Sequence, residues 1–272
     1  MRDSNTHGAC AQAVGKAMLL FESFEAKTHE VRQKDTPRDL VSGVDFAIHR
    51  LICTELSVSG CKIVSEEDMS TWGQLDDPSQ PIWVVDPIDG TTNFISGIPF
   101  FGVSVGLMHE RSFVAGSFGM PKTKEIFYTV SPSSAYRNDV RLVTPEVQLE
   151  TSLVGACFSS RPNSILQQAR GAEMAAFQAI NDNSRGCLRL GSAGGSICYV
   201  ASGKLGAAFG LFMRIWDIAG ALSVARAAGC QVLIAEAGSL DRLHFLVGSK
   251  PIVSQAKTIL AQCVAPESWK GG

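Results

Sequence analysis

The stretch that decides the fold is WVVDPIDGTTNF at positions 83–94. The apolar run 82–85 is rich in β-branched residues and predicts a buried strand. We expect this strand to end at Asp86, because the proline that follows has no N–H for a ladder and biases the residue before it toward an extended conformation. Asp89-Gly90 predicts a turn, and the Thr-Thr-Asn after it predicts a helix start. Two carboxylates in front of amide donors suit a divalent cation and a phosphate, although a D-x-x-D-G alone indicates only an Asx-rich turn.

The composition of the 272-residue chain is that of a globular protein, with 45% hydrophobic and 18% charged residues. This length allows one large domain or two modest ones with a sizeable core. The formal charge of −2 and the pI near 6.2 argue against a nucleic acid or an anionic membrane as a partner held by bulk charge. The polar start of the chain predicts no signal peptide, and no run approaches the ~20 apolar residues of a membrane span. We therefore expect a cytoplasmic protein.

The eight cysteines are scattered along the chain without a C-x-x-C pair. Cys53, Cys157 and Cys198 have apolar neighbours in the sequence, which favours buried free thiols over a disulfide framework. Neither the cysteines nor the five histidines cluster at ligand spacing, and this disfavours a zinc site.

The expected elements divide the chain into two subdomains, 1–150 and 151–272. The first begins with helices at 8–31 and 42–59 and continues with strands at 61–64, 82–85, 101–108, 112–120, 125–130 and within 137–144. The second alternates strands at 152–158, 188–190, 207–209, 231–234 and 244–247 with helices at 163–181, 197–202, 215–228 and 250–264. An α+β front half, with an antiparallel meander, therefore precedes an α/β back half. No linker separates the halves, so we expect them to pack closely with a cleft between them.

Two further acids have ordinary explanations when each is taken alone. Asp45 falls in the first turn of the expected second helix, where the helix dipole favours a carboxylate. Glu66 stands in the acidic run after the strand 61–64, and such runs are usually solvated turns. If that strand lies beside the strand 82–85, Glu66 becomes a third carboxylate at the same sheet end. The sequence alone leaves that pairing open.

Taken together, three motifs resemble the inositol monophosphatase family of metal-dependent, lithium-sensitive sugar- and polyol-phosphate hydrolases. They are Glu66-Glu67, DPIDGTTN at 86–93 and WDIAG at 216–220, which occur in the family's order at plausible separations. The resemblance runs from the first helix to about Lys257. It implies a layered αβαβα sandwich, with an antiparallel or mixed sheet in the front half, and a homodimer.

The resemblance implies a site for two to three Mg²⁺ ions. Their expected ligands are the side chains of Glu66, Asp86, Asp89 and Asp217 and the backbone carbonyl of Ile88. Asp86 would bridge two ions, and Glu66 would also help to hold a weaker third. Such ions neutralise phosphate charge, stabilise the leaving oxygen and lower the pKa of a bound water. Without metal, acids that face one cleft repel one another.

The same resemblance assigns the catalytic and substrate-binding residues. Thr91 would position the attacking water with Asp45 as its carboxylate partner, and Glu66 counts as catalytic through the ion it holds. Lys34 falls on the family's flexible metal-site loop, where contact with phosphate and simple solvation are equally supported. The residues expected to contact substrate are Gly90, Thr91, Thr92, Ser160, Gly191, Ser192, Ala193, Gly210, Arg214 and Asp217.

Three departures from the family pattern concern the substrate and the metal loop. Gly210 stands where the inositol enzymes carry a glutamate that binds a ring hydroxyl, so that contact is missing and inositol specificity does not follow. Arg214 is a candidate for a substrate carboxylate or a second phosphate, and a surface salt bridge explains it equally well. Ser65 replaces the glycine that usually precedes the first acid.

The sequence thus predicts a Mg²⁺-dependent phosphomonoesterase that acts on a small phosphorylated polyol or sugar by metal-activated water attack. One alternative keeps the chemistry and changes the substrate to histidinol phosphate or to an aminocyclitol or aminosugar phosphate. A second alternative, of a different class, is a binding partner in an RNA or transcription complex. We expect that no nucleic acid and no membrane is required for the main activity.

Overall fold

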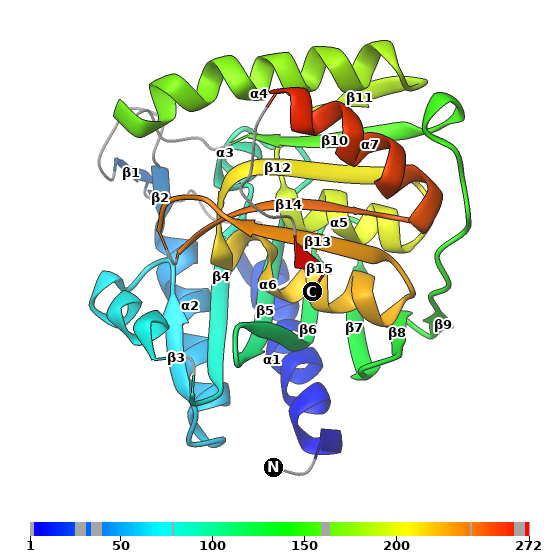
Figure 1. Cartoon of the computed structure of the whole chain (residues 1–272). Coiled ribbons are helices and arrows are strands. Elements are labelled where there is room, and N and C mark those ends of the chain that lie inside the picture. Colours follow the sequence, from blue (N-terminus) through cyan, green and yellow to red (C-terminus); the bar gives the residue numbers. More distant parts are fainter. Residues whose placement is uncertain are drawn as a thin grey trace.

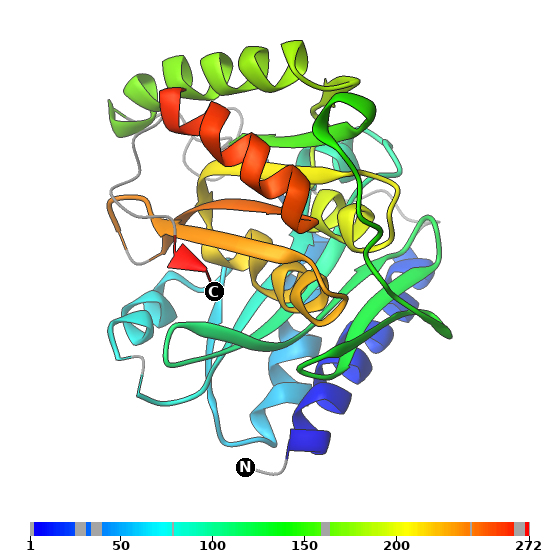
Figure 2. The same ribbon diagram turned by 45° about the vertical axis from the view of Figure 1, so that its right-hand side comes forward.

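Two mixed β-sheets and the helices around them form five layers in the order α, β, α, β, α (Figures 1 and 2). The computed structural model describes residues 3–24, 31–33, 40–77, 79–158, 164–239, 241–263 and 270–271. The predicted α+β sandwich is confirmed. The division at residue 150 stays a prediction, although the strands of one sheet all precede it and those of the other all follow it.

The front sheet has the strand order β3-β4-β5-β6-β7-β8-β9. β3 runs parallel to β4, and every other neighbouring pair is antiparallel. The strands are β3 (Lys62–Ser65), β4 (Ile82–Asp89), β5 (Gly102–His109), β6 (Ser112–Met120), β7 (Glu125–Ser131), β8 (Ser134–Arg137) and β9 (Val140–Arg141). In place of the single further strand expected within 137–144 there are two short strands, of which β8 begins before that range and β9 lies inside it.

Strand β4 runs four residues past its apolar core and carries both motif acids within it. The expectation that it stops at Asp86 is wrong, because β4 continues through Pro87 to Asp89. Its pairing with β5 shifts register between Asp86 and Asp89. A proline is tolerated in a ladder at such an irregularity, where its missing N–H breaks no regular pair. Both acids therefore stand on a bent strand end and not on a loop.

The back sheet has the order β11-β10-β12-β14-β13-β15, with β11, β10 and β12 parallel and the remaining pairs antiparallel. Its strands are β10 (Leu153–Phe158), β11 (Gly186–Leu188), β12 (Ala207–Arg214), β13 (Gln231–Glu236), β14 (Arg242–Gly248) and β15 (Lys270–Gly271). β12 is longer than the expected 207–209, so it reaches directly into the next helix. This extension carries Arg214 to the edge of the layer between the sheets.

Seven α-helices fill the outer and middle layers of the described chain. They are α1 (Asp3–Phe24), α2 (Gly43–Ser57), α3 (Thr91–Ile95), α4 (Ser164–Asp182), α5 (Ala193–Ala201), α6 (Ile215–Ala227) and α7 (Lys250–Cys263). Helices α1 and α2 cover the outer face of the front sheet, α5 and α6 lie between the sheets, and α4 and α7 cover the back sheet (Figure 1). Helix α1 begins at Asp3, five residues before the expected Gly8. Val31, which we expected to end this helix, lies in a strand.

Four short elements complete the described chain. They are β1 (Val31–Gln33), β2 (Leu40–Ser42) and the 3₁₀ helices η1 (Met69–Asp76) and η2 (Leu149–Thr151). Sequence periodicity did not indicate η1, which lies in the connection from β3 to β4. A 3₁₀ helix is too short to show a periodic apolar stripe.

Helix α6 begins 74 residues after the last strand of the front sheet but packs directly on that sheet, against β4, β5 and β6. Glycines permit this close approach. A Cβ at Gly116 of β6 would lie 2.4 Å from the carbonyl oxygen of Gly220, and a Cβ at Gly220 of α6 would lie 2.5 Å from the carbonyl oxygen of Ser117. Helix α6, which carries Asp217 in its first turn, is thereby held against the sheet whose strand β4 carries Asp86.

We expect Gly220→Ala to destabilise the protein by about 1–3 kcal/mol, because overpacking against backbone atoms forces the helix and sheet apart. Gly171→Ala in α4 is the matched control, since nothing lies within 4 Å of a Cβ there. In a helix interior that change stabilises by about 0.5–1 kcal/mol. Urea unfolding of both variants measures the difference, and equal effects would contradict the close-packing account.

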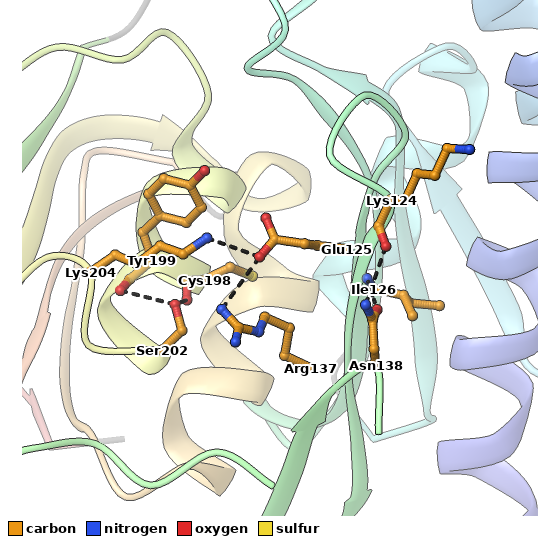
Figure 3. Close-up of polar contacts among 9 residues, drawn as sticks. All are labelled: Lys124, Glu125, Ile126, Arg137, Asn138, Cys198, Tyr199, Ser202 and Lys204. Atoms are coloured by element: carbon orange, nitrogen blue, oxygen red, sulfur yellow. Dashed lines mark hydrogen bonds and ion pairs between the residues drawn. The ribbon is translucent and has the colours of Figure 1, made fainter. Parts of the chain in front are cut away.

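A cluster of charges ties the two halves together on the side away from α2. Glu125 of β7 faces both Lys204 and Arg137 (Figure 3). Its Oε1 lies 2.9 Å from Lys204 Nζ and 3.4 Å from Arg137 Nη1. Lys204 lies in the turn after α5, and its ammonium also sits 4.1 Å from the ring centroid of Tyr199. Both cations are partly exposed, so we assign this cluster a role in alignment of the halves and little net stability.

All eight cysteines are free thiols, as predicted, and Cys157 and Cys198 are buried. Cys53 is only half-buried. Among the described helices, none has the length and apolar character needed to cross a membrane.

Candidate active site

The first three acids of the site come from neighbouring strand ends. β3 pairs in parallel with β4, and Ser65 lies opposite Val85. The next amide, of Glu66, donates to the carbonyl of Val85 at 3.1 Å. The pairing that the sequence left open is therefore present, and it brings Glu66 to the sheet end where Asp86 and Asp89 emerge. Because the carboxyl ends of parallel strands meet at one edge, these acids converge.

Asp217 completes this group from the first turn of α6. One carboxylate oxygen each from Glu66, Asp86 and Asp217 all lie within 4.8 Å of one another. Asp86 is buried, at 1% exposure, and its Oδ1 accepts a hydrogen bond from the N–H of Ile88 at 3.0 Å. The backbone N–H of Arg214 donates to Asp217 Oδ2 at 3.3 Å and fixes that side chain beside the other two.

Asp89 has a different environment, which the sequence did not predict. Its Oδ2 accepts from Ser192 Oγ at 2.5 Å and from the N–H of Gly194 at 2.7 Å, and its Oδ1 accepts from the N–H of Ala193 at 3.3 Å. A carboxylate at a helix N-terminus satisfies amides that have no partner within the helix. Asp89 therefore joins the front sheet to α5, whose first residue lies 104 positions further along the chain.

Three carboxyl groups of the site, those of Asp86, Asp89 and Asp217, have raised pKa values. Burial raises the pKa of Asp86 well above its ordinary value, and the charges of Glu66, Asp89, Asp217 and Asp45 raise it further. Burial likewise raises the pKa of Asp217, and burial raises that of Asp89 to about 6 against the opposing hydrogen bonds from α5. Like charges in a low-dielectric site disfavour ionisation of all members at once.

The donor set fits a hard divalent cation. It consists of carboxylate oxygens at one sheet end, and Asp86 is too buried to be solvated as an isolated anion. A cation at this point would offset the repulsion that raises the three pKa values. Glu66, Asp86 and Asp217 are the residues placed to hold it. Asp89 accepts three hydrogen bonds from Ser192 and the start of α5, which leaves one acceptor position on its Oδ1 for a cation.

These acids form one end of a cleft of about 530 Å³, a volume typical of small-molecule sites. The cleft brings together most of the residues that the sequence predicted. Those that line it are Glu66, Asp86, Ile88, Asp89, Gly90, Thr91, Thr92, Gly191, Ser192, Ala193, Arg214 and Asp217.

Two turns form the border of the cleft and are joined by Asn93. Its side-chain amide donates to the carbonyl of Phe100 at 2.7 Å and to that of Leu190 at 2.8 Å. Gly191 and Gly90 both have φ of +92°, and a Cβ at Gly191 would lie 2.6 Å from the Asn93 amide nitrogen. The buried Asn93 thus fixes the turn before α5 against the turn before α3. Sequence reasoning treated this asparagine only as part of the motif and missed its bridging role.

Two predicted residues do not line the cleft. Asp45 lies in the first turn of α2 at 2% exposure, close enough for its charge to act on Asp86. Gly210 is enclosed in β12, where a Cβ would lie 2.4 Å from Phe245 and 2.6 Å from Met213. The missing glutamate could not be restored at this position without displacement of that ring. Ser160 and Lys34 lie outside the described residues.

The positive charge of Arg214 is already used in an ion pair, which agrees with the expectation that a salt bridge explains this residue as well as substrate binding does. Its guanidinium pairs with Asp241, and its Cζ lies 5.0 Å from the ring centroid of Trp72 and 5.2 Å from that of Trp216. Arg189, which the sequence analysis did not single out, also lines the cleft and lies over the Phe158 ring at 5.5 Å. Arg189 is exposed and is the second arginine among the residues that line the cleft.

The raised pKa values predict an inverted pH dependence for the metal-free protein. An acid whose folded pKa is raised holds its proton in the folded state while the unfolded state has lost it, so stability falls as pH rises toward the folded pKa. Burial lowers the pKa of His244 to about 4, so this group opposes the trend only below its unfolded value of 6.5. Between pH 6.5 and 8 the carboxyl groups dominate.

We expect the unfolding free energy in EDTA to fall over that interval, by up to about 1.4 kcal/mol per pH unit for each carboxyl group still protonated. Urea unfolding at pH 6.5 and pH 8 measures this change. Saturating Mg²⁺ should remove the fall, because a bound cation takes the place of the protons. A metal-free protein that gains stability over the same interval would contradict the assignment.

Comparison with known proteins agrees with this geometry. Residues 2–272 match the family profile described as the inositol monophosphatase family. An inositol-1-monophosphatase of Mesorhizobium japonicum is 33% identical over 221 residues, which cover 79% of this chain and 80% of the relative. The protein named Nus factor SuhB of Pasteurella multocida is 30% identical over 93% of this chain and 94% of its own length.

Solved structures show the same fold. The crystal structure of the extragenic suppressor protein suhB from Bartonella henselae superposes with a TM-score of 0.81 at 28% identity and covers 96% of this chain and 100% of its own. Family profile, relatives and fold agree with the carboxylate cleft described above. The chain therefore belongs to the inositol monophosphatase family and is a phosphatase.

Proposed function

We propose that this protein is a Mg²⁺-dependent phosphomonoesterase that releases phosphate from a small phosphorylated polyol or sugar. The observation that carries the proposal is the convergence of Glu66, Asp86 and Asp217 within 4.8 Å at the end of a cleft of small-molecule size. Two to three Mg²⁺ ions held by these residues, by Asp89 and by the carbonyl of Ile88 would neutralise the phosphate and activate water for attack.

The residues of the chain then bind, orient and hold protons around the phosphate. The N–H groups of Gly90 and Thr91 border the cleft and would take phosphate oxygens. Thr91 Oγ1 donates to the carbonyl of Ile88 at 2.9 Å, which fixes its hydroxyl at the strand end. From that place the hydroxyl would orient the attacking water, and Asp45 would accept the proton that this water loses.

The leaving group would face the turn before α5 and the apolar side chains beside it. Gly191, Ser192 and Ala193 lie on this border, together with Thr92, Phe100 and Met213. No acidic side chain stands at position 210 to bind a ring hydroxyl, so selection for inositol is not built into that strand. Arg189, which is exposed and lines the cleft, would favour a substrate whose leaving group carries an anionic or strongly polar substituent, whereas Arg214 is already paired with Asp241.

A phosphate-release screen tests the proposal directly. The panel should contain an inositol monophosphate, other polyol and sugar monophosphates, histidinol phosphate and aminocyclitol and aminosugar phosphates. We expect turnover with at least one polyol or sugar phosphate, loss of turnover in EDTA and its return with Mg²⁺. Release only from histidinol phosphate or an amino compound would select the alternative substrate class, and no release from any member would refute the function.

The alternative role in an RNA or transcription complex has one support, the name of the Pasteurella multocida relative. The net charge of −2 argues against nucleic-acid binding through bulk charge, and we do not adopt that role as the main one. From membership of the family we further propose a homodimer, inhibition by lithium and a cytoplasmic location. Analytical ultracentrifugation and LiCl titration of phosphate release test the first two.

A further inference from the structure

The 3₁₀ helix η1, in the connection from β3 to β4 (Figure 1), carries a tryptophan that contacts the segments bearing both the first and the last acid of the site. The indole Nε1–H of Trp72 donates to the carbonyl of Ser65 at 2.9 Å. Its ring lies 4.6 Å from the ring of Trp216, centroid to centroid, at an interplanar angle of 38°. Trp72 does not itself line the cleft, so any effect on the site acts through these neighbours.

At one end of this contact, Ser65 is held through every polar group it has. Its N–H donates to Thr71 Oγ1 at 3.3 Å, its hydroxyl lies 2.8 Å from His49 Nδ1, and its carbonyl accepts from Trp72. Ser65 is 1% exposed, and Glu66 is the next residue. The Ser65 carbonyl also accepts from the N–H of Asp68 at 3.2 Å, and its hydroxyl accepts from the N–H of Glu67 at 3.4 Å. Four of these five bonds therefore come from η1 or the turn that enters it. The backbone that delivers Glu66 is therefore fixed by η1.

At the other end, the ring of Trp72 contacts the two residues that flank and hold Asp217. Trp216 precedes Asp217 directly and is fully buried. Arg214, whose backbone N–H binds the Asp217 carboxylate, lies with its Cζ 5.0 Å from the Trp72 ring centroid and is anchored by Asp241. Aromatic and cation–π contacts of this kind are directional and resist sliding.

We propose that Trp72 is a positioning residue that sets the separation of Glu66 and Asp217 for metal binding. This inference rests on the proposed metal-dependent function. Glu66 follows strand β3 and Asp217 lies in the first turn of helix α6, and the two carboxylates repel each other whenever no cation is bound between them. A single side chain that is bonded to the residue before one acid and stacked on the residue before the other opposes that separation. Groups that orient ligands in this way typically change metal affinity by about 10–100-fold when lost.

The test compares two substitutions that remove different parts of the contact. Trp72→Phe keeps an aromatic ring and removes the bond to Ser65, whereas Trp72→Leu removes both the bond and the ring contacts. Mn²⁺ binding is measured by electron paramagnetic resonance of the free ion, and the half-saturating Mg²⁺ for phosphate release is measured beside it. We expect Trp72→Leu to weaken Mn²⁺ binding by about 10–100-fold and Trp72→Phe to weaken it by a smaller factor. At saturating Mg²⁺ the turnover of both variants should return toward the wild-type value, because Trp72 does not itself line the cleft.

Trp83→Phe is the matched control. Trp83 is also buried and also donates from its Nε1, to Ser59 Oγ at 2.8 Å, but its ring packs with α1 and α2 on the outer face of the front sheet. The Trp83→Phe substitution should lower the midpoint of thermal unfolding and leave the Mn²⁺ affinity unchanged. If Trp72→Leu lowers the midpoint equally and leaves Mn²⁺ affinity unchanged, Trp72 is only structural and the proposal is overturned.

A second comparison asks whether the effect passes through the first acid. In a Glu66→Gln background, Trp72→Phe should have little further effect on Mn²⁺ affinity, because the ligand that it positions has lost its charge. Equal effects in both backgrounds would also overturn the proposal. The Mn²⁺ titration needs no substrate, so a protein that binds metal through this arrangement but hydrolyses no panel member would refute the proposed function and not the role of Trp72.

Discussion

Asp86→Asn is expected to abolish phosphate release and, at the same time, to stabilise the metal-free protein. Asp86 lies in the middle of the acid group, at 1% exposure, and burial and four neighbouring carboxylates raise its pKa. An amide has the same shape, and its oxygen can still accept the N–H of Ile88, which lies 3.0 Å from Asp86 Oδ1. The substitution therefore removes a charge and little packing.

The activity loss follows from the loss of the central ligand. Metal ions at such sites supply several kcal/mol of charge stabilisation, and since about 1.4 kcal/mol is a factor of ten, we expect turnover to fall by at least about 10³-fold. The gain in stability follows from the raised pKa, because the ionised carboxylate is less favourable in the folded state than in water. We expect about 1–2 kcal/mol in EDTA at pH 7.5.

Phosphate release with Mg²⁺ and urea unfolding with EDTA measure the two effects. Asp139→Asn is the control, because it makes the same chemical change on an exposed residue. It should leave turnover and stability nearly unchanged. A variant at position 86 that kept wild-type turnover would remove Asp86 from the metal site, and one that was less stable in EDTA would show that the carboxylate has a favourable partner.

Asp45→Asn should separate catalysis from metal binding. Asp45 lies behind the ligand group, in the first turn of α2, and is not one of the three acids whose oxygens converge. If it takes the proton of the attacking water, its loss should lower kcat by about 10²–10³-fold, the usual contribution of a general base. Mn²⁺ affinity should stay within about twofold, since only the charge near Asp86 changes.

Thr91→Val provides the partner experiment. Thr91 Oγ1 donates to the Ile88 carbonyl at 2.9 Å, so its hydroxyl has a fixed place beside the ligands. Groups that act as one unit are strongly non-additive, and the double variant should lose little more turnover than Asp45→Asn alone. If the two losses multiply, Asp45 and Thr91 act independently, and the proposed transfer from water through this pair is wrong.

Local chemistry in the sequence was sufficient for the elements that hold the site. The β-branched run before Asp86 predicted a buried strand, and the apolar stripe of α2 and the glycine after α6 predicted those helices. A strand or helix that buries one or both of its faces has apolar residues at regular short spacings, and these spacings can be read from neighbouring positions in the sequence. Strand ends and turns were less accurate: β4 passes Pro87, and η1 gave no signal, because bulges and 3₁₀ turns depend on the neighbouring strand and not on periodicity.

The candidate ligands were identified through the resemblance of three short motifs to a metal-dependent family, and oxygen donors are the ligands that Mg²⁺ prefers. The sequence did not predict how far apart these ligands lie or which residues bind to them. Asp89 is bound to Ser192 and Gly194, more than 100 positions away, and Arg214 is paired with Asp241. Gly210 illustrates the same limit. The missing glutamate was visible in the sequence, whereas the reason that no larger side chain fits, the ring of Phe245, comes from the adjacent strand β14.

The sequence by itself identified the candidate residues for metal and phosphate, because three short motifs in it resemble a metal-dependent family. The tertiary structure alone decided how far apart those residues lie and what holds them there. That decision depends on the approach of α6 to the front sheet through Gly116 and Gly220 and on the contacts of Trp72 across the two halves. Both join segments about 100 or more residues apart, and contacts at such separation leave no periodic trace in the chain.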